Sequence, residues 1–324
     1  MFPLEPGPVS RHESQVGSIF TGPYGLRAGW RILIFFALLA TLLGATAPLQ
    51  RRIIQRLGHD FSAPNVALTR AFTFGLVILA TAIVGKFERR QPGDYGLPAR
   101  GLLGKNFWMG ALWGFAMLSL IMLLMLLAHA YSPGSAALSP LAILKFGLLW
   151  AVAFLMVGLF EEFSFRGYLQ FTLTWGLGFW PATGITCVLF ALAHGANPGE
   201  NWVGLVEIVL IAFFLCVALR RTGNLWFAIG WHMAFDWGES FFYSTPNSGI
   251  SAVGHMLNAS LKGSKWLSGG SVGPEASIFD LVVTIAGILL LLMVYPQAKY
   301  PTTTPAFVPA QPAGELPASN HPAI

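Results

Sequence analysis

The sequence predicts an all-α, polytopic membrane protein in which about eight transmembrane helices form a bundle around a polar intramembrane cavity. Of its 324 residues, 55% are hydrophobic and only 10% are charged, whereas about 25% are charged in an average soluble domain. The hydrophobic residues collect in runs close to the roughly 20 residues that a helix needs to cross a bilayer. Ionisable side chains inside several of these runs predict the cavity.

Eight apolar segments are candidates for membrane spans. In chain order they are residues 30–49, 64–85, 107–129, 142–160, 178–194, 204–219, 225–243 and 278–295. The fifth and sixth are short for a span, which is tolerated where other helices, and not lipid, surround a helix. Both cysteines, Cys187 and Cys216, lie inside these runs, so the sequence gives no support for a disulfide framework or a thiolate metal site.

The same pattern divides the chain into four regions. They are a polar N-terminal cytoplasmic segment (1–29), three helices with their loops (30–136), a core that contains the ionisable residues (137–298) and a disordered, proline-rich tail (299–324). The first region has no early apolar run, so we expect no cleavable signal peptide. The tail is rich in proline and almost uncharged, a composition that does not form a packed core.

Lysine and arginine counts predict the orientation. The loop between the second and third spans is basic, whereas the next loop, "AYSPGSAALSP", has no basic residue. By the positive-inside rule the basic loop is cytoplasmic, and alternation then places both termini in the cytoplasm. Arg51, Arg52 and Arg56 count against this orientation. The net charge of +5 is spread over the loops, which argues against nucleic-acid binding.

The fourth apolar run ends in the charged segment "FEEFSFRGYLQ". On a helix, Glu162 and Arg166 are an i, i+4 pair on one face, with the acid before the base. Glu161 points about 100° away from Glu162 and is free to accept a proton, which suits a general base in an apolar site. The alternative is an ordinary ion pair at the end of a helix.

Two later segments carry histidines. His194 closes the fifth run, one turn after Phe190, and His232 and Asp236 share one face of the seventh run at i, i+4. The Asp236 carboxylate can orient one imidazole nitrogen of His232 and direct the other at a water or a metal, or both residues can be ligands. The alternatives are an interfacial His194 and a buried hydrogen-bonded pair that holds helices together.

Together, the three segments predict one cavity with the chemistry of a hydrolase. Two histidines, carboxylates and a candidate base suit metal-assisted or general-base hydrolysis. No serine or cysteine stands in an arrangement typical of a nucleophile. Three more acids are expected to be structural: Glu207, for which lining the same cavity is the alternative, Glu239 at the membrane interface and Asp280 as a helix cap.

In this order, the segments resemble the CAAX prenyl endopeptidase and bacteriocin-processing family of intramembrane proteases. That family's pattern is E-E-x-x-x-R, then F-x-x-x-H, then H-x-x-x-N; here it is Glu161-Glu162-x-x-x-Arg166, Phe190-x-x-x-His194 and His232-x-x-x-Asp236. The stretches "RTGNLWFAIGWH" and "GGSVGPEAS" are also similar to the family, the second to its bacterial members. Asp236 departs from the pattern, since asparagine is common there, and it adds a negative charge to the site.

The resemblance implies that residues 137–298 are a protease core with catalytic residues Glu161, Glu162, Arg166, His194, His232 and Asp236. It implies that Glu161 activates the attacking water and that Arg166 orients Glu162. The two histidines and Asp236 would stabilise the oxyanion or bind a metal. Members of the family are described both as metalloproteases and as glutamate proteases, so a divalent ion such as Zn²⁺ on His194 and His232 stays open.

The implied partners are a peptide or membrane-protein substrate and the lipid bilayer, and the implied location is a bacterial plasma membrane. Two other classes of function compete with a protease. One is a non-catalytic scaffold or bacteriocin-immunity protein that keeps the helices without turnover. The other is a proton-coupled transporter, which would show interrupted helices in two related halves.

Overall fold

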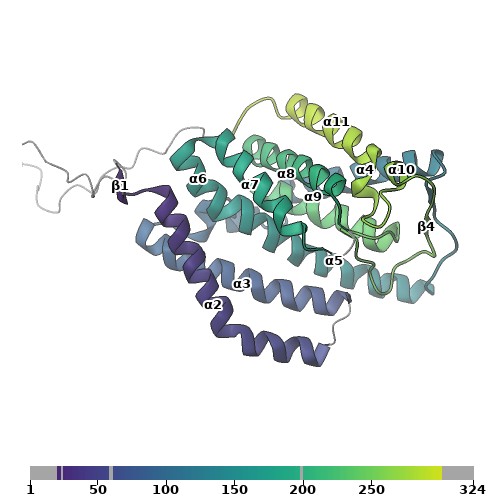
Figure 1. Ribbon diagram of the computed structural model, residues 1–324, viewed down its shortest axis with the longest axis horizontal. Helices are drawn as coiled ribbons and strands as arrows, with labels where there is room; N and C mark the ends of the chain where they lie inside the picture. Colours follow the sequence, from purple (N-terminus) through teal and green to yellow (C-terminus); the bar gives the residue numbers. More distant parts are fainter. Residues whose placement is uncertain (1–19, 23–24, 58–60, 198–199, 301–324) are drawn as a thin grey trace, which may run out of the picture.

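The computed structural model describes residues 20–22, 25–57, 61–197 and 200–300 (Figure 1). Most of these residues are helical. The strands among them form two short antiparallel pairs, β1 (Thr21–Gly22) with β2 (Gly25–Leu26) and β3 (Tyr131–Ser132) with β4 (Ser260–Leu261). The predicted all-α class is therefore confirmed. Most of the N-terminal segment and, from residue 301 on, the predicted disordered tail lie outside the described residues.

Each of the predicted spans coincides with a helix. These helices are α2 (Ala28–Leu57), α3 (Ala63–Glu88), α4 (Lys105–Leu127), α5 (Pro140–Phe163), α7 (Phe179–His194), α8 (Trp202–Thr222), α9 (Trp226–Trp237) and α11 (Ile278–Val294). Within the described residues, 5 helices are long and apolar enough to cross a membrane, and α7 and α11 are shorter apolar helices. The sixth span is longer than predicted, because α8 has 21 residues.

Two of these helices run on through π-helical turns. α5 continues into η3 (Ser164–Leu169) and then α6 (Gln170–Leu177), so the fourth helix extends well beyond residue 160. Within η3, Gly167 has φ −85° and ψ −119°, which bends the chain without breaking it. α9 likewise continues into η4 (Gly238–Phe242). Single π-helical turns are rare and frequently lie at functional sites.

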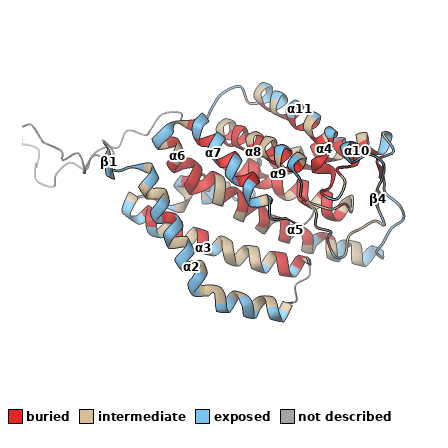
Figure 2. Cartoon of the chain, in the orientation of Figure 1, coloured by how far each residue is buried: buried red, intermediate tan, exposed pale blue. Residues whose placement is uncertain are grey.

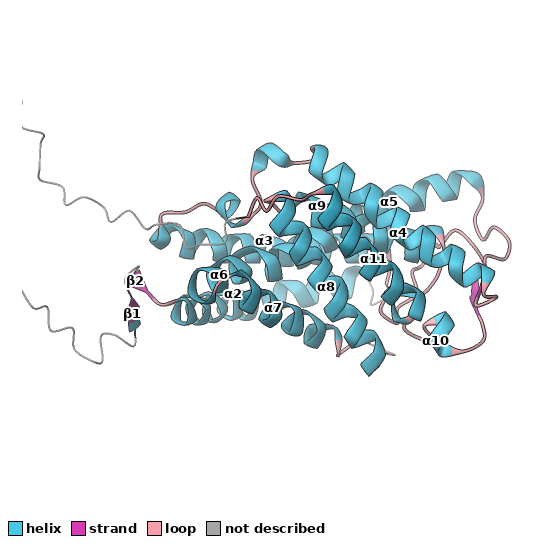
Figure 3. Cartoon of the chain, turned by 90° about the horizontal axis from the view of Figure 1, so that it is seen from above, coloured by secondary structure: helices cyan, strands magenta, loops and turns pink. Residues whose placement is uncertain are grey.

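The helices pack side by side along the long axis of the molecule. α2 and α3 lie on one side and α11 on the other, while α10 (Lys265–Ser268) and β4 lie at the end opposite β1 (Figures 1 and 3). Short helical turns, η1 (Pro92–Tyr95), η2 (Ala99–Gly101) and η5 (Pro274–Ala276), complete the loops. The predicted cytoplasmic location of the termini stays a prediction.

The outer helices expose apolar side chains. In Figure 2 the buried positions are concentrated in the central helices, whereas α2 is mostly exposed or intermediate, with Phe35 as its one buried residue. Large aliphatic side chains such as Leu112, Leu148 and Leu192 are more than half exposed. A soluble domain rarely exposes apolar surface on this scale, so this surface suits a lipid environment.

α4 and α9 approach each other closely through glycines. A Cβ placed on Gly110 would lie 2.0 Å from the carbonyl oxygen of Phe227, and one on Gly230 would lie 2.0 Å from that of Phe107. Gly114 makes the same kind of contact with the Trp231 carbonyl. Small residues at such spacing let the backbones of membrane helices pack directly. α9, which carries His232 and Asp236, is thereby fixed against α4.

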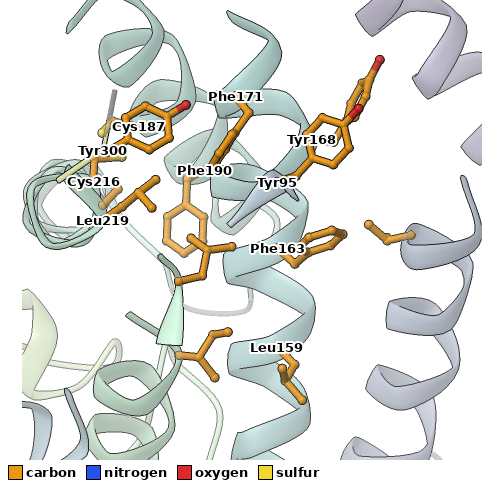
Figure 4. Close-up of a cluster of buried hydrophobic side chains, with 14 of the residues drawn as sticks. Tyr95, Leu159, Phe163, Tyr168, Phe171, Cys187, Phe190, Cys216, Leu219 and Tyr300 are labelled. Atoms are coloured by element: carbon orange, nitrogen blue, oxygen red, sulfur yellow. The ribbon is translucent and has the colours of Figure 1, made fainter. Parts of the chain in front are cut away.

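Aromatic side chains fill the interior beside the charged motif. Phe163, Tyr168 and Phe190 belong to one buried cluster, which also contains both cysteines (Figure 4). Tyr300 is part of the same cluster and packs against Phe171 with ring centroids 4.6 Å apart. The second residue of the predicted tail, Tyr300, is therefore buried in the protein.

Candidate active site

The two adjacent glutamates at the end of α5 face different surroundings. Glu162 is fully buried, and its Oε1 accepts a hydrogen bond of 3.0 Å from Nη1 of Arg166. The predicted i, i+4 pair is therefore present, although Arg166 lies in the π-helical η3. Glu161 instead lines a cavity of about 500 Å³ that is shared with His194, His232 and Asp236.

Arg166 is held from two sides. Besides its bond to Glu162, its guanidinium lies 4.3 Å from the centre of the Phe190 ring, an arrangement in which a cation interacts with the ring face. The same ring also contacts His194, whose imidazole centre is 4.5 Å away. Phe190 therefore connects the charged motif on α5 and η3 with the histidine on α7.

His194 is the last residue of α7 and presents one nitrogen to the cavity. Its Nδ1 is 2.8 Å from the carbonyl oxygen of Phe190, one turn earlier. A carbonyl only accepts, so Nδ1 carries the hydrogen of this bond, and in the neutral ring Nε2 is an acceptor. Nε2 lies 3.7 Å from Oε2 of Glu161.

His232 joins the two glutamates. Its Nδ1 donates to Oε1 of Glu162 at 2.8 Å, while its Nε2 lies 3.6 Å from Oε2 of Glu161 and 3.4 Å from Oδ2 of Asp236. The Nε2 atoms of both histidines thus converge on one oxygen of Glu161. The separations exceed the usual range of a direct hydrogen bond.

A further charged residue, Arg70, lies at this site and was not predicted. Nη2 of Arg70, on α3, lies 3.9 Å from Oε1 of Glu161, and Arg70 lines the cavity. Arg70 falls inside the predicted second span, so the rule that singled out the other ionisable residues identifies it too. Further polar residues of the cavity wall, Asn65, Asn197, Asn247, Ser248 and Glu275, lie at helix ends or in loops and carry no such signal.

The three acids expected to be structural are all buried, and two of them differ from expectation. Glu207 does not line the cavity. Glu239, which was expected at the membrane interface, is fully buried inside the protein and lies in the π-helical η4. Asp280 does not cap α11; the cap is Ser277, whose Oγ accepts from the Asp280 backbone N–H at 3.3 Å.

The donor atoms at this site have the chemistry of zinc ligands. Zinc is bound by imidazole nitrogens and carboxylate oxygens at about 2.0–2.2 Å, and His194, His232 and Glu161 offer these atom types. Within the part of the chain that the structure describes, however, no group of three or more His, Cys, Asp or Glu side chains is arranged to hold a metal ion. We therefore derive no catalytic step through a metal.

Exposed apolar helices around a cavity with carboxylates, imidazoles and arginines define an integral membrane protein with a buried polar site. A family model described as type II CAAX prenyl endopeptidase Rce1-like matches residues 143–238, the segment that contains all three motifs. The match confirms the family resemblance over these residues and supports a protease. Comparisons with curated proteins and with solved structures gave no match.

Removal of the Arg166 charge should destabilise the fold. The substitution Arg166→Met leaves Glu162 fully buried without its cation, and breaking a buried pair in this way costs about 3–5 kcal/mol of unfolding free energy. Thermal unfolding of the purified protein in detergent measures the change, with Arg51→Met on the exposed end of α2 as the matched control. Equal unfolding temperatures for the two variants would contradict the assignment of Arg166 to this pair.

Proposed function

We propose that the protein is an intramembrane endopeptidase that hydrolyses a peptide bond with a water activated by Glu161. The observation that carries this proposal is the convergence of both histidine Nε2 atoms on Oε2 of Glu161 inside a buried cavity. The family match over residues 143–238 supports a protease. Hydrolysis within a membrane needs an enclosed polar site of this kind, since lipid supplies neither water nor a base.

The arrangement assigns a role to each side chain around the water. The water donates one hydrogen bond to Nε2 of His194, whose Nδ1–H is held by the Phe190 carbonyl, and the other to Glu161. As the water oxygen attacks the scissile carbonyl carbon, its proton passes to Glu161. Glu161 then gives that proton to the leaving nitrogen when the C–N bond breaks.

His232 is placed to stabilise the oxyanion formed in the attack. In its imidazolium form it donates from both nitrogens, so Nδ1–H binds Glu162 while Nε2–H is available to the developing negative charge. Asp236 lies beside Nε2 and compensates the imidazolium charge between turnovers. Arg166 acts through Glu162 and is a positioning residue.

Hydrolysis in H₂¹⁸O tests this function. The purified protein, reconstituted in liposomes, is incubated with a library of membrane-associated peptides that includes prenylated CAAX peptides, and the products are analysed by mass spectrometry. We expect cleavage products with one ¹⁸O atom in the new carboxylate. Absence of cleavage throughout the library would instead favour a scaffold or a transporter.

Metal analysis separates the glutamate mechanism from a zinc-dependent one. Because no three-ligand group is present in the described residues, we expect full activity of wild-type protein that contains less than stoichiometric metal and is treated with a chelator. Metal content is compared with that of His194→Ala and His232→Ala. Stoichiometric zinc in the wild type, lost in both variants together with activity, would establish the zinc-dependent form.

A further inference from the structure

One part of the cavity wall is acidic. Asp236 and Glu275 both line the cavity that contains Glu161. Among the described lining residues the only lysine or arginine is Arg70, and it lies beside Glu161. The wall therefore has two carboxyl groups within the same cavity as the candidate base: Asp236 has His232 as a basic neighbour, whereas Glu275 has no ion-pair partner among the described residues.

Glu275 is hydrogen-bonded to the loop that contains Ser248. It lies in η5, is 7% exposed, and its Oε1 accepts a hydrogen bond from the backbone N–H of Ser248, another lining residue. Burial raises the pKa of Glu275 to about 8, and the neighbouring Asp236 adds to the rise, while the bond from Ser248 opposes it. A cation bound beside Glu275 would favour its ionised form.

Two more buried acids stand behind this wall. The Glu239 carboxylate accepts from Nδ2 of Asn247 at 3.1 Å and from the Glu275 backbone, whereas Oδ2 of the fully buried Asp280 has no hydrogen-bond partner among the described residues. Electrostatic interactions link Glu239 to Glu275, Asp236 and Asp280. No lysine, arginine or histidine forms an ion pair with Glu239, Glu275 or Asp280 among the described residues.

Such a wall fits a positively charged ligand. Buried carboxylates that lack partners are costly, and a cation that enters between them removes much of that cost. No group of three or more acids among the described residues is arranged to hold a metal ion, and we therefore consider an organic cation as the ligand. Lys and Arg side chains have the length to reach a buried carboxylate while their backbone stays in the cavity.

We propose that Asp236 and Glu275, with Glu239 behind them, form a subsite that binds a Lys or Arg side chain of the substrate close to the scissile bond. The inference rests on the proposed peptidase function and names its substrate class: peptides with a basic residue near the cleavage site. The subsite also gives Asp236, where the family pattern has asparagine, a role in specificity.

Matched peptides test the subsite. A single Lys is moved along a cleavable peptide and compared at each position with norleucine, which has the same length without the charge. At one position we expect kcat/KM to be at least tenfold higher for Lys, which corresponds to about 1.4 kcal/mol. Equal kcat/KM at every position in an active protein would overturn the subsite and leave the peptidase function standing.

Substitutions of Glu275 test whether this residue causes the preference for the Lys peptide. The ratio of kcat/KM for the Lys and norleucine peptides should fall toward one in Glu275→Gln and stay high in Glu275→Asp, which keeps the charge. Glu207→Gln is the matched control, because Glu207 is a buried acid outside the cavity wall. An unchanged ratio in Glu275→Gln would contradict the assignment to Glu275. The wild-type ratio tests the subsite even if that variant does not fold.

The preference should also depend on pH. The described charged groups that interact electrostatically with Glu275 are acids, namely Asp236 on α9, Glu200 before α8, Glu239 on η4 and Asp280 on α11. A Lys side chain stays charged to about pH 10, so the Lys to norleucine ratio should rise as pH increases through 8 and Glu275 ionises. The ratio should not rise in Glu275→Gln, and a rise of equal size there would contradict the proposal.

A binding measurement keeps the two hypotheses apart. In Glu161→Gln, which lacks the proposed base, the dissociation constants of the Lys and norleucine peptides are compared without turnover. We expect tighter binding of the Lys peptide. If wild type cleaves neither peptide and this variant binds the Lys peptide more tightly, the peptidase function fails and the cationic subsite stands; equal binding overturns the subsite.

Discussion

Replacing Glu161 by Gln should reduce kcat for peptide hydrolysis by about 10²–10⁴-fold, the usual contribution of a general base. Gln has nearly the same shape as Glu but accepts no proton from water. Both histidine Nε2 atoms face Oε2 of Glu161 at 3.6–3.7 Å, so the substitution removes the base and keeps its surroundings. Single-turnover rates of the reconstituted protein measure the loss.

Two comparisons make this result specific to the chemical step. Glu207→Gln removes another buried acid that does not line the cavity, and its rate should match that of the wild type. KM should change little in Glu161→Gln, because the residue is proposed to act on the water and not on substrate binding. Wild-type turnover by Glu161→Gln would overturn the mechanism.

The second large effect is expected from Gly230 on α9. In Gly230→Ala the new Cβ would lie 2.0 Å from the Phe107 carbonyl oxygen of α4, a distance that real structures do not contain. The two helices must then separate, at a cost at or above the upper end of the about 1–3 kcal/mol typical of overpacking. The unfolding temperature in detergent and the peptidase rate should both fall, since His232 moves with α9.

Gly184→Ala in α7 is the matched control for that experiment. A Cβ there has no atom within 4 Å, so the variant should unfold at or slightly above the wild-type temperature, because Ala favours a helix over Gly. If both variants unfold at the wild-type temperature, the α4–α9 contact is looser than the structure indicates.

Much of the fold could be predicted from the sequence because membrane helices are constrained by length and hydropathy. Every predicted span contains a helix, and the Glu162–Arg166 pair follows from helical spacing. The π-helical turns after Phe163 and Trp237 could not be predicted, since they leave no pattern in apolar residues. One of them, η4, contains Glu239, which is fully buried in the protein.

The candidate site was predicted where its residues stand in local motifs. Arg70 was within reach of the same reasoning, because it is an ionisable residue inside a predicted span. Glu275, Asn247 and Ser248 were not, since only the folded loops bring them to the cavity. Arg70 and Glu275 also lie outside residues 143–238, the segment that matches the family model.

The ion pairs around Glu161 and Glu162 have a consequence for the formal charge of the six groups that they link. The groups are three carboxylates, two guanidiniums and one imidazolium, from Glu161, Glu162, Asp236, Arg70, Arg166 and His232. With all of them ionised, the sum is zero. A site inside a membrane is most stable near electrical neutrality, so a double substitution such as Glu161→Gln with Arg70→Gln preserves this balance, whereas either single change leaves one unit of net charge in the interior.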